Sequence, residues 1–176
     1  IQMITKEIAK KVFDEALSTG ADFAELFCED TYENLIQMLS GKIESASTKH
    51  KYGIGLRVLL DLQEVYGYTS DCSLEGLLKL AKKLKGAYNA APKGISYEFK
   101  YEDATKNGYV KINRYSKDVP QEEKIAYLHT VDDVMAGYDK RIVQRIVTIN
   151  DKTQFVTIFN TKGKYITDIR NQQRIG

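Results

Sequence analysis

Hydrophobic residues recur at helical spacing in three parts of the chain. They return every three or four positions over residues 4–17, 74–84 and 120–138, with charged residues between them. Glu122 and Glu123 fall in the first turn of the third stretch, where the helix dipole favours carboxylates. The pattern therefore predicts three helices. Residue types that begin or end helices stand at their bounds: Thr5, Ser70, Asp71 and Pro120 at the starts, and Gly20 and Gly86 at two of the ends.

Two other parts of the chain show strand patterns. After the first helix we expect five strands, and after the third helix we expect three more. Tight turns such as Ser40-Gly41, Asp151-Lys152 and Lys162-Gly163 join most of them, which favours antiparallel pairing because parallel neighbours need a long crossover. A tyrosine-rich stretch at 95–115 is β-prone without clear strand bounds. The expected strands are residues 23–30, 35–39, 42–47, 53–60, 64–69, 141–150, 154–160 and 165–170.

Clustered strands with helices between the clusters indicate an α+β fold. We expect one or more antiparallel sheets with about three helices, and no Rossmann-type doubly wound sheet. Gly53-Ile54-Gly55 lacks the third glycine of a dinucleotide loop and leads into a strand, so it forms no phosphate site. We expect residues 1–176 to form one domain with sub-lobes 1–90 and 95–176, since residues 85–94 have the composition of a boundary.

Composition narrows the class of protein further. The 176 residues are 43% hydrophobic and carry a net charge of +2, and no apolar stretch is long enough to span a bilayer. Two cysteines, Cys28 and Cys72, provide no disulfide framework, which favours free thiols and a cytoplasmic location. Residues 140–174 hold eight bases and two acids. We interpret this basic stretch as exposed strand faces or an interface with an acidic domain and do not expect nucleic-acid binding, because no recognition motif is present.

The residues offer little for catalysis or metal binding. His50 lies between two lysines and is interpreted as a solvated residue at a strand end, and His129 as a helix-surface or boundary residue. Pairing of either histidine with Cys28 or Cys72 stays open, although nothing in the local sequence supports it. Asp132-Asp133 is interpreted as a solvated helix face. We therefore assign no catalytic, cofactor-binding or metal-binding residue in this chain.

Gly53 and Gly55 call for a structural explanation because they lie in an expected strand. Glycines there permit a bulge or the close approach of a neighbour. If Ile54 and its alternate neighbours face the core, Arg57 lies with Gly55 on the opposite face. We interpret that face as part of a core-packed sheet, with a peptide-binding or partner surface as the alternative.

Four segments resemble the TldD/PmbA family, whose members are often labelled modulators of DNA gyrase. The first is Gly-Ala-Asp-Phe-Ala-Glu-Leu-Phe at residues 20–27, directly after a helix. The second is Gly-Ile-Gly-Leu-Arg-Val at 53–58, and the third is Gly-Tyr-Thr-Ser-Asp at 67–71 before a leucine-rich helix. Asn-Thr-Lys-Gly at 160–163 is similar to a family turn. The resemblance is strongest over residues 1–85.

The resemblance implies a zinc metallopeptidase that acts on peptides or small proteins. Family members are more than twice as long as this chain, and their His-Glu-x-x-x-His metal motif lies in a C-terminal half. The motif is absent here, so the resemblance assigns zinc to the full-length protein and no metal ligand to this chain. Because the chain starts with Ile1 and stops abruptly at Gly176, we expect it to be the non-catalytic N-terminal domain of a longer protein.

We expect the domain to line a substrate cleft or to serve assembly. The partners that follow are the chain's own C-terminal catalytic half, a peptide substrate, and a homodimer or a heterodimer with a family paralogue, with no membrane. Two other functions stay open: a non-enzymatic protein-binding or assembly module, and a nucleic-acid-associated, gyrase-modulating regulator. A salt-dependent interaction with DNA would support the latter.

Overall fold

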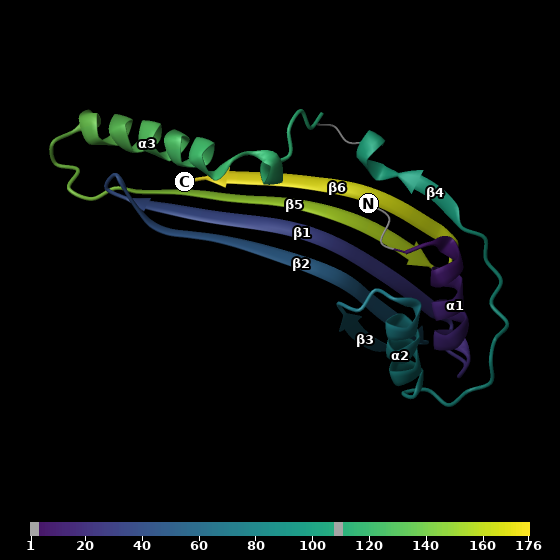
Figure 1. Cartoon of the computed structure of the whole chain (residues 1–176). Helices are drawn as coiled ribbons and strands as arrows, with labels where there is room; N and C mark the ends of the chain where they lie inside the picture. Colours follow the sequence, from purple (N-terminus) through teal and green to yellow (C-terminus); the bar gives the residue numbers. More distant parts are fainter. Residues whose placement is uncertain (1–3, 108–110) are drawn as a thin grey trace. The chain divides into compact units, whose positions relative to one another are not determined.

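The structure is a computed structural model that describes residues 4–107 and 111–176. Its elements follow the order helix, three strands, helix, strand, two 3-10 turns, helix and two strands (Figure 1). The helices are α1 (Lys6–Leu17), α2 (Leu74–Lys85) and α3 (Gln121–Tyr138), and the 3-10 turns are Ala104–Asn107 and Ser116–Asp118. The strands are β1 (Phe23–Leu39), β2 (Lys42–Leu60), β3 (Gln63–Thr69), β4 (Lys100–Asp103), β5 (Ile146–Asn160) and β6 (Lys164–Ile175).

The six strands form one mostly antiparallel sheet in the order β3-β2-β1-β5-β6-β4. The β2–β3 hairpin is antiparallel, with Leu60 opposite Gln63 and Ile54 opposite Thr69. The short strand β4 pairs parallel to β6, with Lys100 opposite Lys164. The α+β prediction is therefore confirmed, and β4 is an exception to the expected antiparallel pairing.

The chain divides into two compact units. Unit 1 contains the described parts of residues 1–30, 52–108 and 155–169, and unit 2 those of residues 31–51, 109–154 and 170–176. Strands β1, β2, β5 and β6 contribute residues to both units.

Helices α1 and α2 cover the sheet in unit 1. They pack against each other and bury one face of the β1–β2 strand pair, in which Leu26, Ile54 and Leu56 have no exposed surface. An aromatic group completes this core, because the Phe99 ring meets the Phe159 ring edge-on at 5.3 Å. Burial of such large apolar side chains is the main stabilising contribution to the unit.

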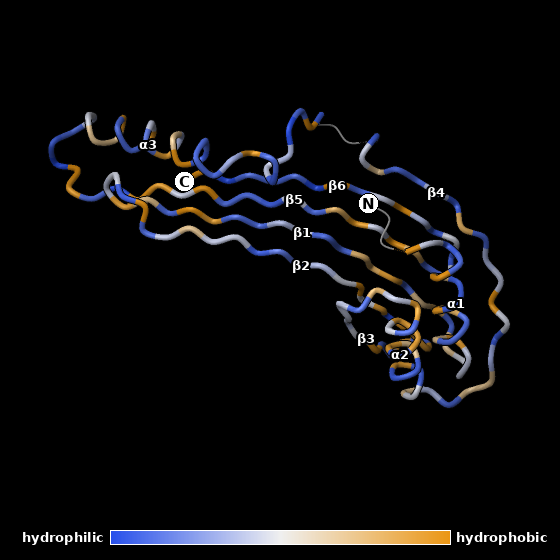
Figure 2. The backbone as a smooth tube through the Cα atoms, viewed as in Figure 1, coloured by the Kyte–Doolittle hydropathy of each residue, from blue (hydrophilic) through white to orange (hydrophobic). Residues whose placement is uncertain are grey.

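Unit 2 has a smaller core beneath α3. Leu128 of the helix packs with Ile36, Met38, Val147 and Ile149 of the strands. The backbone of α3 alternates between hydrophilic and hydrophobic residues along its length (Figure 2). Two of its three buried residues are charged, Lys124 and Asp132, so polar partners must compensate their burial.

The predicted helices are confirmed, with one change at a cap. Thr5 caps α1 as expected, since its hydroxyl accepts a hydrogen bond from the Ile8 amide at 3.3 Å. The cap of α2 is Ser73 rather than Ser70 or Asp71. Asp71 instead accepts a hydrogen bond from the Ser73 amide at 3.0 Å, which holds the capping residue in place.

The strands are longer than the sequence predicts. The expected strands 23–30 and 35–39 are both parts of β1, and 42–47 and 53–60 are both parts of β2. The turn expected at Asp151-Lys152 is wrong, because β5 runs through both residues with Asp151 fully buried. Polar residues within these strands satisfy their side chains through long-range contacts, which local patterns do not reveal.

The β-prone stretch 95–115 contains β4 and one 3-10 turn, and its residues 108–110 lie outside the described part of the chain. Among the described residues, no helix combines the length and apolar character that crossing a bilayer requires.

Candidate functional site

Glu25 joins three strands of unit 1. Its carboxylate accepts hydrogen bonds from Arg57 on β2 at 3.1 Å and from the Asn160 amide on β5 at 3.2 Å. Arg57 also approaches Glu64 of β3 at 3.8 Å. The guanidinium therefore has two carboxylate neighbours, and its charge is balanced within the unit.

Asp22 and Asn160 hold turns beside this cluster. The Asp22 carboxylate accepts hydrogen bonds from the Asp61 backbone amide at 3.0 Å and from Lys93 at 3.2 Å. The hydrogen bond from the Asp61 amide is the main reason that the pKa of Asp22 lies below its ordinary value. The Asn160 side-chain oxygen accepts from the amides of Lys162 and Lys164, which closes the β5–β6 turn. Asp22 and Asn160 thus stabilise the turns that follow β2 and β5.

Gly53 and Gly55 lie under tyrosines of the neighbouring strand. A Cβ on Gly53 would come within 2.6 Å of the Thr69 carbonyl oxygen and would meet the Tyr68 ring, and a Cβ on Gly55 would lie 2.8 Å from the Tyr66 ring. The predicted close approach to a neighbour is confirmed. Arg57 lies on the face of Gly55, because the alternate residues Ile54, Leu56 and Val58 are fully buried on the other face.

The two histidines lie in different surroundings. His50 lies within β2 rather than at a strand end, and its ring stacks on Tyr32 at a centroid distance of 4.3 Å. The expected strand-end position is therefore wrong, whereas His50 is exposed, as expected of a solvated residue. His129 is exposed on α3, as predicted.

The two cysteines are free thiols. Cys28 is fully buried, and burial raises its pKa to about 12. Burial is also the main cause of a raised pKa at the partly buried Cys72. A thiol with a raised pKa is a poor nucleophile at neutral pH, because the thiolate is the reactive form.

Asp132 is buried, contrary to the prediction of a solvated helix face. Its carboxylate accepts two hydrogen bonds from Arg145, at 2.9 and 3.0 Å, and these bonds are the main cause of its lowered pKa. Its neighbour Asp133 is exposed, as expected. The Arg145 backbone also binds the β1–β2 turn, where the Ser40 amide donates to the Arg145 carbonyl at 2.8 Å.

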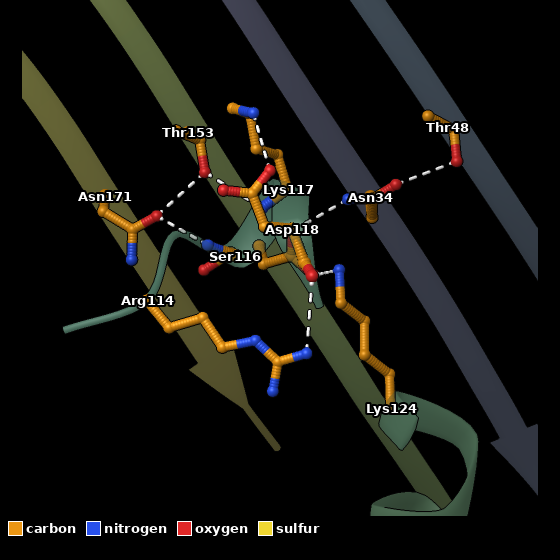
Figure 3. A network of polar contacts seen from close by, with 10 residues as sticks. Asn34, Thr48, Arg114, Ser116, Lys117, Asp118, Lys124, Thr153 and Asn171 are labelled. Atoms are coloured by element: carbon orange, nitrogen blue, oxygen red, sulfur yellow. Dashed lines mark hydrogen bonds and ion pairs between the residues drawn. The ribbon is translucent and has the colours of Figure 1, made fainter. Parts of the chain in front are cut away.

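A polar network with a buried ion pair at its centre connects α3 with the strands of unit 2 (Figure 3). Lys124 forms an ion pair with Asp151 at 2.7 Å, and both side chains are almost fully buried. The other Asp151 oxygen accepts from the Asn34 amide at 2.9 Å, and Asn34 in turn accepts from the Thr48 hydroxyl at 2.8 Å. The sequence does contain a signal for this network, since Lys124, Leu128 and Asp132 follow one another at intervals of four on the buried side of α3.

The segment before α3 is fixed on the sheet by a second group of contacts, also drawn in Figure 3. Asn171 of β6 accepts hydrogen bonds from the Ser116 amide at 3.0 Å and the Thr153 hydroxyl at 2.8 Å. Thr153 in turn accepts from the Lys117 amide at 3.2 Å. These contacts attach the segment to β5 and β6.

The described residues form a sizeable surface cavity in each unit. The cavity of unit 2 has a volume of about 470 Å³ and lies between this segment, α3 and strands β5 and β6. Arg114 at its wall is paired with Glu123 at 3.0 Å. The cavity of unit 1, about 460 Å³, is lined by β4, the following 3-10 turn, β5 and β6.

The described residues provide no metal centre. They contain no group of three or more histidine, cysteine, aspartate or glutamate side chains that could hold an ion. The zinc implied by the resemblance thus has no site among them.

Two family models match successive parts of the chain. Residues 24–91 match "PmbA/TldA metallopeptidase domain 1", and residues 114–176 match "PmbA/TldA metallopeptidase central domain". The chain belongs to the PmbA/TldD family. The matched ranges include the Glu25 contacts, the tyrosine-covered glycines and the polar network beneath α3. No curated protein matches the chain.

Solved structures show the same fold. Candidate modulators of DNA gyrase from Thermotoga maritima and Bacteroides thetaiotaomicron are 17% and 16% identical to the chain, with TM-scores of 0.65 and 0.63. Each comparison covers 97% of this chain and 38% of the other. TldE from Thermococcus kodakarensis is 14% identical to the chain, with a TM-score of 0.57. That comparison covers 96% of this chain and 37% of TldE. The chain thus spans little more than a third of these proteins.

Proposed function

We propose that this chain is the non-catalytic N-terminal part of a TldD/PmbA-like zinc metallopeptidase that acts on peptides or small proteins. The observation that carries the proposal is the succession of two metallopeptidase-family domains in a chain that spans 38% of its first structural neighbours. The zinc site and the activated water belong, in this proposal, to a C-terminal half.

The part played by this chain is to line the substrate cleft or to assemble the enzyme. Its partners are the C-terminal half, a peptide substrate and a second family subunit. A fixed segment before α3 and a cavity of about 470 Å³ with paired charges suit the binding of a polar polypeptide. We also propose a cytoplasmic location, because Cys28 and Cys72 are both free thiols.

The test compares this chain with the complete protein encoded by its gene. Both are incubated with zinc and a peptide library, and cleavage is followed by mass spectrometry. We expect cleavage by the complete protein only, and loss of that cleavage with a chelator. Cleavage by residues 1–176 alone would contradict the proposal, and inactivity of the zinc-loaded complete protein would favour a binding module instead.

A further inference from the structure

The cavity of unit 2 contains two hydrogen-bond donors that the chain itself does not use. The Asn171 side-chain oxygen accepts from the Ser116 amide and the Thr153 hydroxyl, so both of its lone pairs are occupied. Within residues 4–107 and 111–176, neither the Asn171 side-chain nitrogen nor the Ser116 hydroxyl has a hydrogen-bond partner (Figure 3). Both residues line the cavity, and Ser116 is only 4% exposed. Polar groups buried to this extent normally have a partner.

The acceptors around the same cavity are already engaged. The Glu123 carboxylate pairs with Arg114 at 3.0 Å. The Asp151 carboxylate behind Lys124 accepts from the Asn34 amide and pairs with the Lys124 ammonium. Of the charged residues that line the cavity itself, Arg114 and Lys124 are basic and Glu123 alone is acidic. The free donors and the excess of one positive charge therefore favour a ligand that brings acceptor atoms and one negative charge.

The rest of the cavity wall is apolar. It consists of Val119, Tyr127, Ile149 and Ile175. Ile149 belongs to the core beneath α3, whereas Tyr127 and Ile175 are half exposed, at 51% and 42%. The volume of about 470 Å³ lies in the range of sites for small ligands. An inorganic anion would leave these walls unused, so the ligand should carry an apolar group beside its charge.

We propose that this cavity binds the C-terminal carboxylate of a peptide that ends in an apolar residue. The choice of a peptide rests on the proposed function, which this inference makes more specific. The Asn171 side-chain nitrogen and the Ser116 hydroxyl donate to the carboxylate, and the last side chain lies against Val119 and Ile149. A C-terminal residue is favoured over an aspartate or glutamate side chain, because it carries the carboxylate and the apolar group on one Cα.

Nuclear magnetic resonance titration of the purified chain measures the binding with four probes. Acetyl-glycyl-leucine should bind with a dissociation constant of about 1 mM and shift the signals of Ser116 and of the Asn171 side-chain amide. Acetyl-glycyl-leucinamide, which lacks the charge, should bind about tenfold more weakly or less. Acetyl-glutamyl-glycinamide, whose carboxylate lies on a side chain, and inorganic phosphate should also bind more weakly than the first probe.

Asn171→Asp is the sharpest variant, because it keeps the oxygen that accepts from Ser116 and Thr153 and replaces the free donor with an acceptor. It should weaken the binding of acetyl-glycyl-leucine about tenfold or more. Ser116→Ala removes the second donor and should weaken binding about threefold. Gln172→Glu is the matched control and should leave binding unchanged. It adds the same charge one residue along β6, on the opposite face of the strand and outside the cavity lining. Thermal unfolding shows that each variant is folded.

The outcomes separate this inference from the proposed function, because the titration needs neither zinc nor cleavage. Equal affinity for the acid and the amide, or full affinity in Asn171→Asp, would overturn the carboxylate site. So would the absence of binding well above the expected dissociation constant, even if the complete protein cleaved peptides. Binding of the acid that Asn171→Asp removes would support the site, even if the zinc-loaded complete protein were inactive and the proposed function therefore wrong.

Discussion

At the scale of single residues, the burial of Lys124 and Asp151 is a costly feature of unit 2. Moving two charges out of water is unfavourable, and their attraction offsets this cost only with good geometry and further hydrogen bonds. The ion pair of 2.7 Å and the Asn34 amide supply both. Removing one partner would leave the other charge buried and uncompensated.

We expect Lys124→Met to lower the free energy of unfolding by about 3–5 kcal/mol. Asp151→Asn should also destabilise the chain. The double variant should be more stable than the sum of the two losses indicates, because it leaves no unpaired charge. Urea unfolding of the four proteins measures this coupling. Lys82→Met, on the exposed side of α2, is the control and should change stability by less than about 0.5 kcal/mol. Strict additivity would contradict the interpretation.

The sequence reveals some of these residues and conceals others. Alternation along one strand places Arg57 and Gly55 on the same face, so their arrangement could be predicted locally. Asp132 and Lys124 could not be assigned, because Arg145 and Asp151, which compensate their charges, lie outside α3. Pairing across the fold thus decides whether a charged residue on a helix is buried.

At the scale of elements, Asp132 fastens α3 to the segment just before β5 and to the turn between β1 and β2. The bonds from Arg145 hold its pKa below the ordinary value of 3.8. Asp132 therefore binds fewer protons in the folded chain than in the unfolded chain at acid pH. Its contribution to stability is fully present above that ordinary value and is lost as the pH falls through the lowered pKa.

Asp132→Asn should accordingly lower the free energy of unfolding at pH 7. The difference in this free energy between the variant and the parent chain should become smaller as the pH falls below the ordinary pKa of aspartate. Denaturant unfolding at a series of pH values measures both. The adjacent Asp133→Asn is the matched control, because Asp133 is exposed on the same helix. A difference in the free energy of unfolding that stays constant down to the lowest pH measured would show that the charge of the Asp132 carboxylate does not stabilise the fold.

Strand β2 requires glycine where tyrosines of β3 cover it. Gly53→Val and Gly55→Val should each destabilise the fold by about 1 kcal/mol or more. The loss of stability should be larger at Gly53, because the new side chain would meet a backbone oxygen there. At Gly55 it would meet only the exposed Tyr66 ring. Thermal unfolding measures both, with Gly137→Val as the control, since nothing lies within 4 Å of a Cβ there. Unchanged melting temperatures would show that the close packing is incidental.

Helices were easier to predict than strands for a physical reason. A helix satisfies its own backbone, so periodic apolar residues and a local cap such as Thr5 suffice to locate it. A strand is completed by its neighbours. Asp151 looks like a turn residue, yet it stays in β5 because Lys124 and Asn34 bind its carboxylate. The parallel pairing of β4 likewise depends on a distant strand.

At the scale of the whole molecule, the names of the matched family domains imply a metal, whereas the described residues show no group of ligands for one. The matched family domains are metallopeptidase domains, whereas the described residues contain no cluster of three potential ligands. A zinc site normally takes three or four protein ligands from a preformed group. If the proposed function is correct, the metal ligands of the enzyme come from residues outside those described here.

We expect residues 1–176 to purify without stoichiometric zinc. Metal analysis after dialysis against zinc-containing buffer should give far less than one ion per chain, and a chelator should leave the thermal unfolding of the chain unchanged, because no part of its fold depends on the ion. The complete protein, treated in parallel, is the positive control for metal loading. One tightly held zinc per short chain, lost on His129→Ala or Cys72→Ala, would mean that this chain carries a metal site of its own.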